Sequence, residues 1–181
     1  QKGILREEGA NICDFTHDKL REVAYAEISV PQRRVLHRRV AQALEALNAE
    51  GLDPVSAQIA AQYDQAGLPD QALPYYQRAG LVAARLYANE DAIAWLRRAL
   101  VLLQEQPATT QRDTTELALQ FALARLYRIT QGWAAPEVEQ AVARALLLSE
   151  KVGDPVQRAE ALYGAQTVYV VAAQLDKVES T

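Results

Sequence analysis

The chain has 181 residues, of which 50% are hydrophobic, and a formal net charge of −4. This length suits one domain, or a small domain joined to part of another, with enough apolar residues for a continuous core. The acidic balance argues against general nucleic-acid binding, which favours a basic surface, and no segment approaches the ~18 uninterrupted apolar residues of a membrane span. The single cysteine excludes an internal disulfide framework and favours a cytoplasmic location.

Residues 3–16 form the one part of the chain that does not read as helix. Two short apolar-bearing runs, GILRE and NICDF, flank Glu8-Gly9-Ala10, which is typical of a tight turn. We therefore expect a small β-hairpin, and because an isolated hairpin is marginal in water we expect it to pack on a helix. Beyond residue 16 strand-like alternation is nearly absent, and alanine, the strongest helix former, is abundant. The predicted fold class is all-α with a short N-terminal β-hairpin.

Helix starts and stops then alternate, with proline near first positions and glycine just beyond last ones. Helices are expected over about 15–28, 31–50, 54–66, 69–87, 89–103, 116–131, 136–152 and from 155, with an incipient ninth from about Leu175. Ser29-Val30-Pro31-Gln32 fits a capping box for the second of these helices. Its buried face is expected to carry Leu36, Val40, Ala43, Leu44 and Leu47.

The most specific pattern lies in AAQYDQAGLPDQALPYYQRA, residues 60–79. The residues Ala60, Tyr63, Gly67, Ala72, Tyr76 and Ala79 have the spacing of the small, aromatic, glycine, alanine, aromatic and alanine positions of a tetratricopeptide repeat. The same template laid from Gly80 gives Ala83, Tyr87, Ala92, Leu96 and Ala99, with Tyr87 in place of the turn glycine. A third, looser match begins at Gly164 with Thr167.

The second register begins 20 residues after the first, instead of the usual 34. The helix over 69–87 must therefore belong to two successive helix pairs. We predict a tetratricopeptide-like α-solenoid of antiparallel helix pairs, in which small residues lie where helices touch and aromatic residues fill the gaps beside them. The alternative is another kind of alanine-rich helical bundle.

Two segments, DFTHDKLREVAYAEI…PQRRVLHRRVAQALEAL and AQYDQAGLPDQALPYYQRAG…YANEDAIAWLRRAL, resemble a region of large bacterial STAND-class signal-transduction ATPases. That region follows the nucleotide-binding core: a winged-helix domain ends in a hairpin and a Phe-x-His helix, and a tetratricopeptide array follows. Phe15 and His17 match the Phe-x-His pair, and residues 56–103 match the first repeats. Arg33, Arg34, His37 and Arg38 match the family's RR-x-x-HR helix. The later segment GWAAPEVEQAVARALLLSEKVGDP resembles the cyclase-linked members particularly.

The resemblance implies two domains within the chain. Residues 1–50 would be the C-terminal part of a winged-helix-like domain, a hairpin plus two helices, and residues 51–181 tetratricopeptide-like repeats truncated at the C-terminus. We therefore expect the chain to be a segment of a longer protein. The family's phosphate loop lies upstream and no GxxxxGK[ST] occurs here, so no cofactor is expected for this chain.

The expected function is that of a non-catalytic interaction and regulatory arm of a multidomain signalling ATPase, which contacts a protein, a peptide or other domains of the same chain. The alternative is a scaffold segment of a bacterial transcriptional activator whose DNA-binding domain lies elsewhere. A third hypothesis is a helical enzyme domain. It would need a cluster of polar residues in a pocket, and the sequence does not indicate one. We expect no direct contact with nucleic acid or membrane. A dimer remains an open alternative, because an apolar helix face at the truncated end would favour association.

His17 raises the question of a catalytic or metal site. A zinc site would need Cys13, His17, His37 and one carboxylate to converge, and their spacing matches no common zinc signature. No nucleophile with an adjacent base is apparent either. We therefore predict no metal and no catalytic residue, and we expect His17 to pack between the hairpin and the first helix.

The candidate partner-binding residues are Arg34, Arg38, Gln58, Gln62 and Gln77. Arg34 and Arg38 fall opposite the expected buried face of their helix. They would either contact nucleotide phosphates or a neighbouring domain in the intact ATPase, or form a solvated, locally paired face. The three glutamines are polar groups on the surface of the first repeats. Most tyrosine and tryptophan residues are expected to pack, with an exposed subset available to anchor a peptide.

Overall fold

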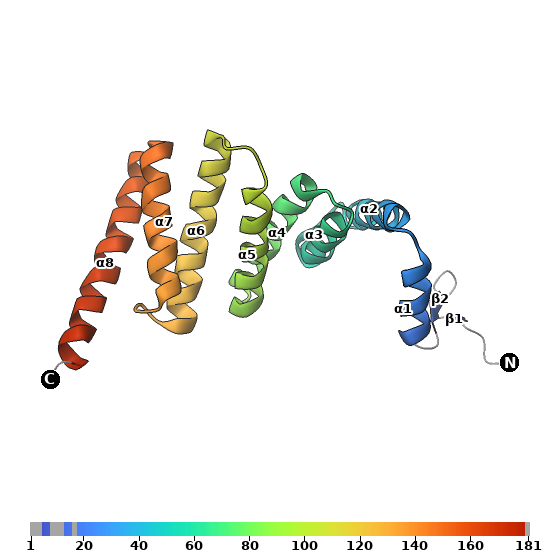
Figure 1. Ribbon diagram of the computed structural model, residues 1–181, viewed down its shortest axis with the longest axis horizontal. Coiled ribbons are helices and arrows are strands. Elements are labelled where there is room, and N and C mark those ends of the chain that lie inside the picture. The colour runs from blue at the N-terminus through green and yellow to red at the C-terminus, as the bar shows by residue number, and fades with distance from the viewer. Residues whose placement is uncertain (1–4, 8–12, 16–17, 180–181) are drawn as a thin grey trace.

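The computed structural model describes residues 5–7, 13–15 and 18–179, and these consist almost entirely of helices that follow one another in a row (Figure 1). The elements are β1 (Leu5–Glu7), β2 (Cys13–Phe15), α1 (Asp18–Glu27), α2 (Val30–Leu47), the short 3₁₀ helix η1 (Asp53–Val55), α3 (Ser56–Gln65), α4 (Pro69–Arg85), α5 (Asn89–Gln104), α6 (Thr110–Gln131), α7 (Pro136–Val152) and α8 (Pro155–Glu179). The predicted all-α class is confirmed. β1 pairs antiparallel with β2, with Leu5 opposite Phe15. The turn expected at Glu8-Gly9-Ala10 and the residue His17 lie outside the described residues.

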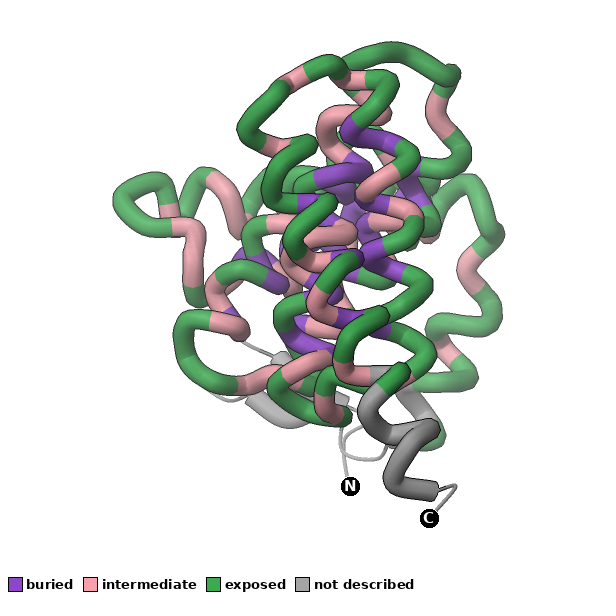
Figure 2. The backbone as a smooth tube through the Cα atoms, turned by 90° about the vertical axis from the view of Figure 1, so that its left-hand side faces the viewer, coloured by how far each residue is buried: buried purple, intermediate pink, exposed green. Residues whose placement is uncertain are grey.

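Each helix from α2 to α8 packs on the helix that follows it in the chain. The loops between α5, α6, α7 and α8 are short, and these helices run in alternating directions (Figure 1). One hydrophobic core extends through the row from Ala41 on α2 to Val168 on α8. Figure 2 shows the buried residues gathered in the interior of this row, with exposed residues around it.

Small residues let the helices approach closely, as the repeat template requires. Ala41, Ala60, Ala72, Ala92 and Ala99 are all fully buried, with exposed fractions of 0%. The aromatic template positions Tyr63 and Tyr76 are buried too, as is Leu96 in the second register. The template therefore identifies the contact residues of α3, α4 and α5 correctly.

The turn position of the template has the left-handed backbone conformation in both registers. Gly67, between α3 and α4, has φ of +73°, which glycine adopts without a steric penalty. Tyr87, between α4 and α5, has φ of 61°, which costs a residue with a Cβ about 1–2 kcal/mol. The second register thus keeps the backbone turn although its glycine is replaced.

Two expected helix boundaries are wrong. The polar run before residue 116 is already helical, because the Thr109 hydroxyl caps α6 by accepting a hydrogen bond from the Arg112 amide at 3.1 Å. The incipient ninth helix does not exist as a separate element, since α8 continues without a break through Leu175 to Glu179. By contrast, Ser29 begins α2 as predicted: the Gln32 side-chain oxygen accepts from the Ser29 amide at 3.3 Å.

The expected buried face of α2 is also wrong. Leu36 and Val40 are each 45% exposed and Leu47 is 82% exposed, whereas Ala41 is fully buried. The reason is that α2 packs on α3 through small and polar residues. His37 and Ala41 lie on this contact side, whereas Leu36, Val40 and Leu47 face away from it. Of the residues predicted to be buried, Leu44 does pack against the core.

Candidate functional site

The five candidate partner-binding residues do not form one cluster. Arg34 lies against the α3–α4 turn, where a Cβ added to Gly67 would be 3.5 Å from its Nε atom. Arg38 and Gln58 are exposed on α2 and α3, and Gln62 is half-buried between these two helices. Gln77 lines a different surface, a hollow between α4 and α6. Their role in binding stays a prediction.

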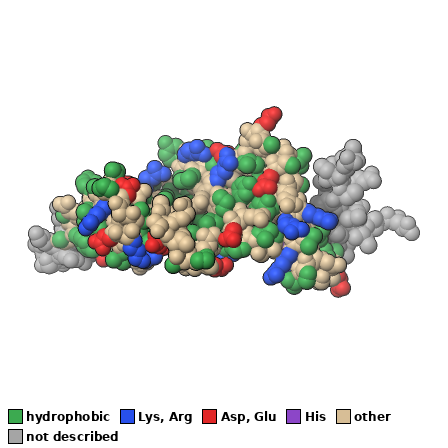
Figure 3. Space-filling model, turned by 90° about the horizontal axis from the view of Figure 1, so that it is seen from above, with side chains coloured by type: hydrophobic (Ala, Val, Ile, Leu, Met, Phe, Trp, Pro, Cys, Tyr) green, Lys and Arg blue, Asp and Glu red, His purple; other side chains and the backbone are tan. Residues whose placement is uncertain are grey.

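The basic residues at the start of α2 hold three helices together. Arg33 donates hydrogen bonds to the carbonyl oxygens of Ile28 at 2.7 Å and Ala26 at 3.1 Å, and thereby satisfies free carbonyls at the end of α1. His37 Nδ1 donates to Gln62 Oε1 on α3 at 2.7 Å, so its Nε2 accepts from the Tyr25 hydroxyl on α1, also at 2.7 Å. Arg33 and His37 therefore have a local structural explanation. Figure 3 shows basic side chains gathered at this end of the row, beside the residues drawn in grey.

Two carboxylates between the helices each accept hydrogen bonds from side chains on two other helices. Glu45 on α2 accepts from the hydroxyl of Tyr63 on α3 at 2.8 Å and from that of Tyr75 on α4 at 2.5 Å. The two tyrosine rings stack with their centroids 5.9 Å apart. A carboxylate held by two hydrogen bonds between packed helices is a structural link. It is not placed to act as a general base.

Asp64 makes the equivalent link one helix further along. Arg98 on α5 forms a bidentate pair with Asp64, with both N···O distances 2.6 Å, and the Tyr76 hydroxyl on α4 donates to the same carboxylate at 3.1 Å. Tyr76 stacks on Trp95 with ring centroids 5.8 Å apart. The hydrogen bonds that Arg98 donates to the Asp64 carboxylate raise the pKa of Arg98 above its ordinary value, so the guanidinium stays charged.

Alkaline pH should weaken the fold through these tyrosines. Burial, strengthened by the nearby carboxylates, raises the pKa of Tyr63, Tyr75 and Tyr76 to about 12 each. A tyrosine in the unfolded chain titrates near pH 10. Their contribution to stability is therefore complete below about pH 10 and is lost as the pH rises toward 12. Urea unfolding at increasing pH should show a decline over this window that is shallower in Tyr75→Phe; an equal decline in both proteins would contradict this account.

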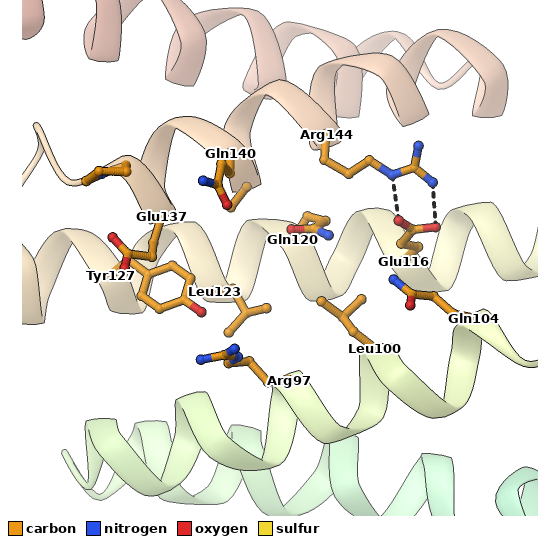
Figure 4. A pocket seen from close by; sticks show the side chains of 12 residues that line it. Arg97, Leu100, Gln104, Glu116, Gln120, Leu123, Tyr127, Glu137, Gln140 and Arg144 are labelled. Atoms are coloured by element: carbon orange, nitrogen blue, oxygen red, sulfur yellow. Dashed lines mark hydrogen bonds and ion pairs between the residues drawn. The ribbon is translucent and has the colours of Figure 1, made fainter.

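One concave surface is a groove between α5 and α7 with α6 as its floor, and we call it the α5–α7 groove (Figure 4). It encloses about 530 Å³. Its lining residues are Arg97, Leu100 and Gln104 on α5, Glu116, Gln120, Leu123 and Tyr127 on α6, and Pro136, Glu137, Gln140, Ala141 and Arg144 on α7 or at its start. Apolar side chains thus alternate with amide and charged groups along the groove.

A buried ion pair fixes one end of the groove. Arg144 donates from Nε and Nη2 to the two carboxylate oxygens of Glu116, at 2.6 and 2.9 Å. The Glu116 side chain is only 4% exposed, whereas that of Arg144 is 39% exposed. Tyr127 and Glu137 lie at the other end, with Gln120 and Gln140 between the two ends (Figure 4). Burial raises the pKa of Tyr127, so its hydroxyl remains a hydrogen-bond donor at neutral pH.

The carboxamides give the groove its binding chemistry. A glutamine side chain can both donate and accept hydrogen bonds, and so can the backbone of a peptide in extended form. Gln104, Gln120 and Gln140 come from three different helices and border the apolar side chains of Leu100 on the α5 wall and Leu123 on the α6 floor. The groove can therefore hold a strand of polypeptide by backbone hydrogen bonds and apolar contact together.

The sequence contained a signal for this groove that the prediction missed. Glu116, Gln120, Leu123 and Tyr127 recur at spacings of three and four residues, which places them along one side of α6. A mixed polar and apolar stripe on a helix flanked by two others indicates a partly open face. The exposed aromatic residues lie elsewhere: Tyr87 is 87% exposed and Tyr163 is 72% exposed.

Within the described residues, no group of three or more His, Cys, Asp or Glu side chains is placed to hold a metal ion. None of the described helices has the length and apolar character needed to cross a bilayer. No protein-family model matches the chain, and no curated protein or solved structure is significantly similar to it.

Proposed function

We propose that this chain is a non-catalytic protein-interaction arm that binds an extended segment of polypeptide in the α5–α7 groove. The observation that carries the proposal is the arrangement of Gln104, Gln120 and Gln140 along an apolar floor in a groove of about 530 Å³. This volume lies within the range of ligand sites, and the chemistry of the lining suits a backbone more than a compact metabolite. The bound segment belongs to a partner protein or to another domain of the same chain.

The architecture proposed for this arm is a tetratricopeptide-like solenoid over residues 51–181. The burial of Ala60, Tyr63, Ala72 and Tyr76 at template positions supports it, as does the left-handed turn at Tyr87. A stack of helix pairs in which each unit packs on the next leaves extended grooves along its faces. Peptide binding is the ordinary use of such grooves.

We also propose that the arm belongs to a cytoplasmic signalling ATPase of the STAND class, with a winged-helix-like part in residues 1–50. In this proposal the boundary falls in the loop between the end of α2 at Leu47 and the start of η1 at Asp53, although α2 shares the core of the helices that follow. The exposed apolar residues Leu36, Val40 and Leu47 on α2 support a neighbouring domain that covers them in the intact protein. In this proposal the arm transmits contacts and carries no active site.

Selection from a displayed peptide library against the purified chain tests the groove. Fluorescence anisotropy would then measure the affinity of a selected, labelled peptide for variants of the chain. Gln120→Ala and Gln140→Ala should each weaken binding about fivefold, because each removes one hydrogen bond worth about 1 kcal/mol. Gln111→Ala, an exposed glutamine of α6 outside the groove, is the matched control and should leave the affinity unchanged. Equal affinity of the double variant Gln120→Ala/Gln140→Ala and the unmodified chain would overturn the proposal.

A further inference from the structure

A second concave surface lies between α4 and α6, and we call it the α4–α6 hollow. It encloses about 730 Å³ and is lined by Asp53, Pro74, Arg78, Leu81, Arg85 and Arg125, together with Gln77. The lining residues of α4 recur at spacings of three, four and seven residues, so they form one stripe along that helix. Three guanidinium groups and one carboxylate therefore line an open depression.

Asp53 holds two of these guanidinium groups in place. Arg78 donates from Nε to Asp53 Oδ1 at 2.6 Å, and Arg85 donates from Nη2 to Oδ2 at 2.9 Å. The hydrogen bond from Arg78 is the main cause that lowers the pKa of Asp53, so the carboxylate stays ionised. Each arginine uses one of its five N–H groups in these bonds and keeps the others for a ligand. Asp53 thus orients Arg78 and Arg85 and leaves most of their donors available.

Arg125 adds positive charge from a different helix. It lines the hollow from α6 and also borders a neighbouring depression that Glu160 lines. Within the described part of the chain it forms no ion pair. The excess of guanidinium groups over carboxylates makes the hollow an electropositive depression on a chain whose net charge is negative. A ligand carrying at least one anionic group would neutralise this excess positive charge.

The hollow is separate from the α5–α7 groove. Successive residues of an α-helix are rotated by about 100°, so Arg125 points to the side of α6 opposite the one that carries Glu116, Gln120 and Tyr127. A ligand in the hollow and a peptide in the groove would contact different faces of α6. The two sites can therefore be tested independently.

The apolar residues of the hollow distinguish between anionic ligands. Leu81 is 50% exposed and lies with Pro74 among the arginines. A single-stranded nucleic acid would be bound by phosphate contacts together with aromatic stacking, and the described lining contains no aromatic side chain. A protein segment with an acidic residue next to an aliphatic one satisfies both the charged and the apolar part of this surface.

We propose that the α4–α6 hollow binds an acidic segment of a protein, with an Asp or Glu carboxylate held by Arg78, Arg85 and Arg125 and a neighbouring aliphatic side chain packed on Leu81 and Pro74. The Arg forks suit a carboxylate because two parallel N–H groups match its two oxygens. This site is additional to the groove and does not depend on the function proposed for it.

A labelled peptide of three Asp-Glu-Leu units provides the probe, and fluorescence anisotropy measures its binding to the whole chain. Arg125→Gln should weaken binding at least tenfold, because it removes charged hydrogen bonds from the ligand alone. Arg39→Gln, which changes an exposed arginine of α2 outside both the hollow and the groove, is the matched control and should leave the affinity within twofold. A peptide of Asn-Gln-Leu units should not compete, and raising the salt concentration should weaken binding of the acidic peptide.

Three results would overturn the proposal. They are no binding of the acidic peptide at millimolar concentration, an equal loss in Arg125→Gln and Arg39→Gln, or tighter, Arg125-dependent binding of a single-stranded oligonucleotide. Circular dichroism of Arg125→Gln, whose substituted side chain is exposed, verifies that the variant is folded. A negative result for the hollow does not affect the proposal for the groove, because the glutamine variants of the groove are tested with a different peptide.

Discussion

Gly80→Ala should lower the free energy of unfolding by about 1–2 kcal/mol, although alanine is the better helix former. A Cβ at residue 80 would lie 2.6 Å from both Cγ and Cδ2 of Leu96 and 3.3 Å from the backbone oxygen of Ala92. Leu96 is 1% exposed and is part of the packed core, so its displacement would disturb other buried residues. The steric conflict between α4 and α5 therefore exceeds the gain in helix propensity.

Gly164→Ala in α8 is the matched control for this substitution. Its Cβ would lie 3.6 Å from the nearest atom, a side-chain methyl carbon of Val142, which is an ordinary contact. Here the propensity gain should dominate and raise stability by up to about 1 kcal/mol. Urea unfolding followed by circular dichroism compares both variants with the unmodified chain. A stabilised Gly80→Ala protein would show that α4 and α5 are not packed as closely as described.

Arg144→Leu should destabilise the chain by about 2–3 kcal/mol, because it leaves the Glu116 carboxylate buried without its partner. Glu116 receives both hydrogen bonds of the pair from this arginine, and its side chain is 4% exposed. The partial exposure of Arg144 keeps the expected loss below that of a fully buried pair. The same variant would also reshape one end of the α5–α7 groove.

The double variant Glu116→Leu/Arg144→Leu separates the loss of a partner from the loss of packing. Removing both charges together eliminates the unpaired carboxylate, so its stability should return to within about 1 kcal/mol of the unmodified chain. Urea unfolding of the two single variants and the double variant gives the complete cycle. If the double variant is as unstable as Arg144→Leu, the unpaired charge is not the cause of the loss.

The repeat template predicted the contacts that depend on residue size. Ala60, Ala72 and Ala99 had to be small for the helices to meet, and each is fully buried. The ends of α6 and α7 were also predicted correctly. Gly132 and Gly153 follow these helices as expected, and both have positive φ. These features depend on local spacing and on steric limits, which a single sequence contains.

The burial of α2 was not readable in the same way. The apolar stripe predicted that the side of α2 carrying Leu36 and Val40 is buried. In the structure the opposite side meets α3, where His37 donates to Gln62 and Tyr63 donates to Glu45. Which side of a helix meets its neighbour depends on side chains far along the chain, and hydrophobic periodicity does not contain that information. The stripe on α6 that lines the groove was present in the sequence, but the two walls come from α5 and α7, and a single helix pattern does not show that they lie beside it.

The interhelical carboxylates divide the row into parts of unequal stiffness. Glu45 links α2 to α3 and α4, Asp64 links α3 to α4 and α5, and Glu116 links α6 to α7. Among the described residues, no side-chain hydrogen bond or ion pair joins α5 to α6, so apolar contacts alone hold that junction. Apolar contacts are not directional and tolerate small sliding movements. If the groove binds a polypeptide as proposed, its α5 wall could therefore move relative to α6 without breaking a side-chain hydrogen bond among the described residues.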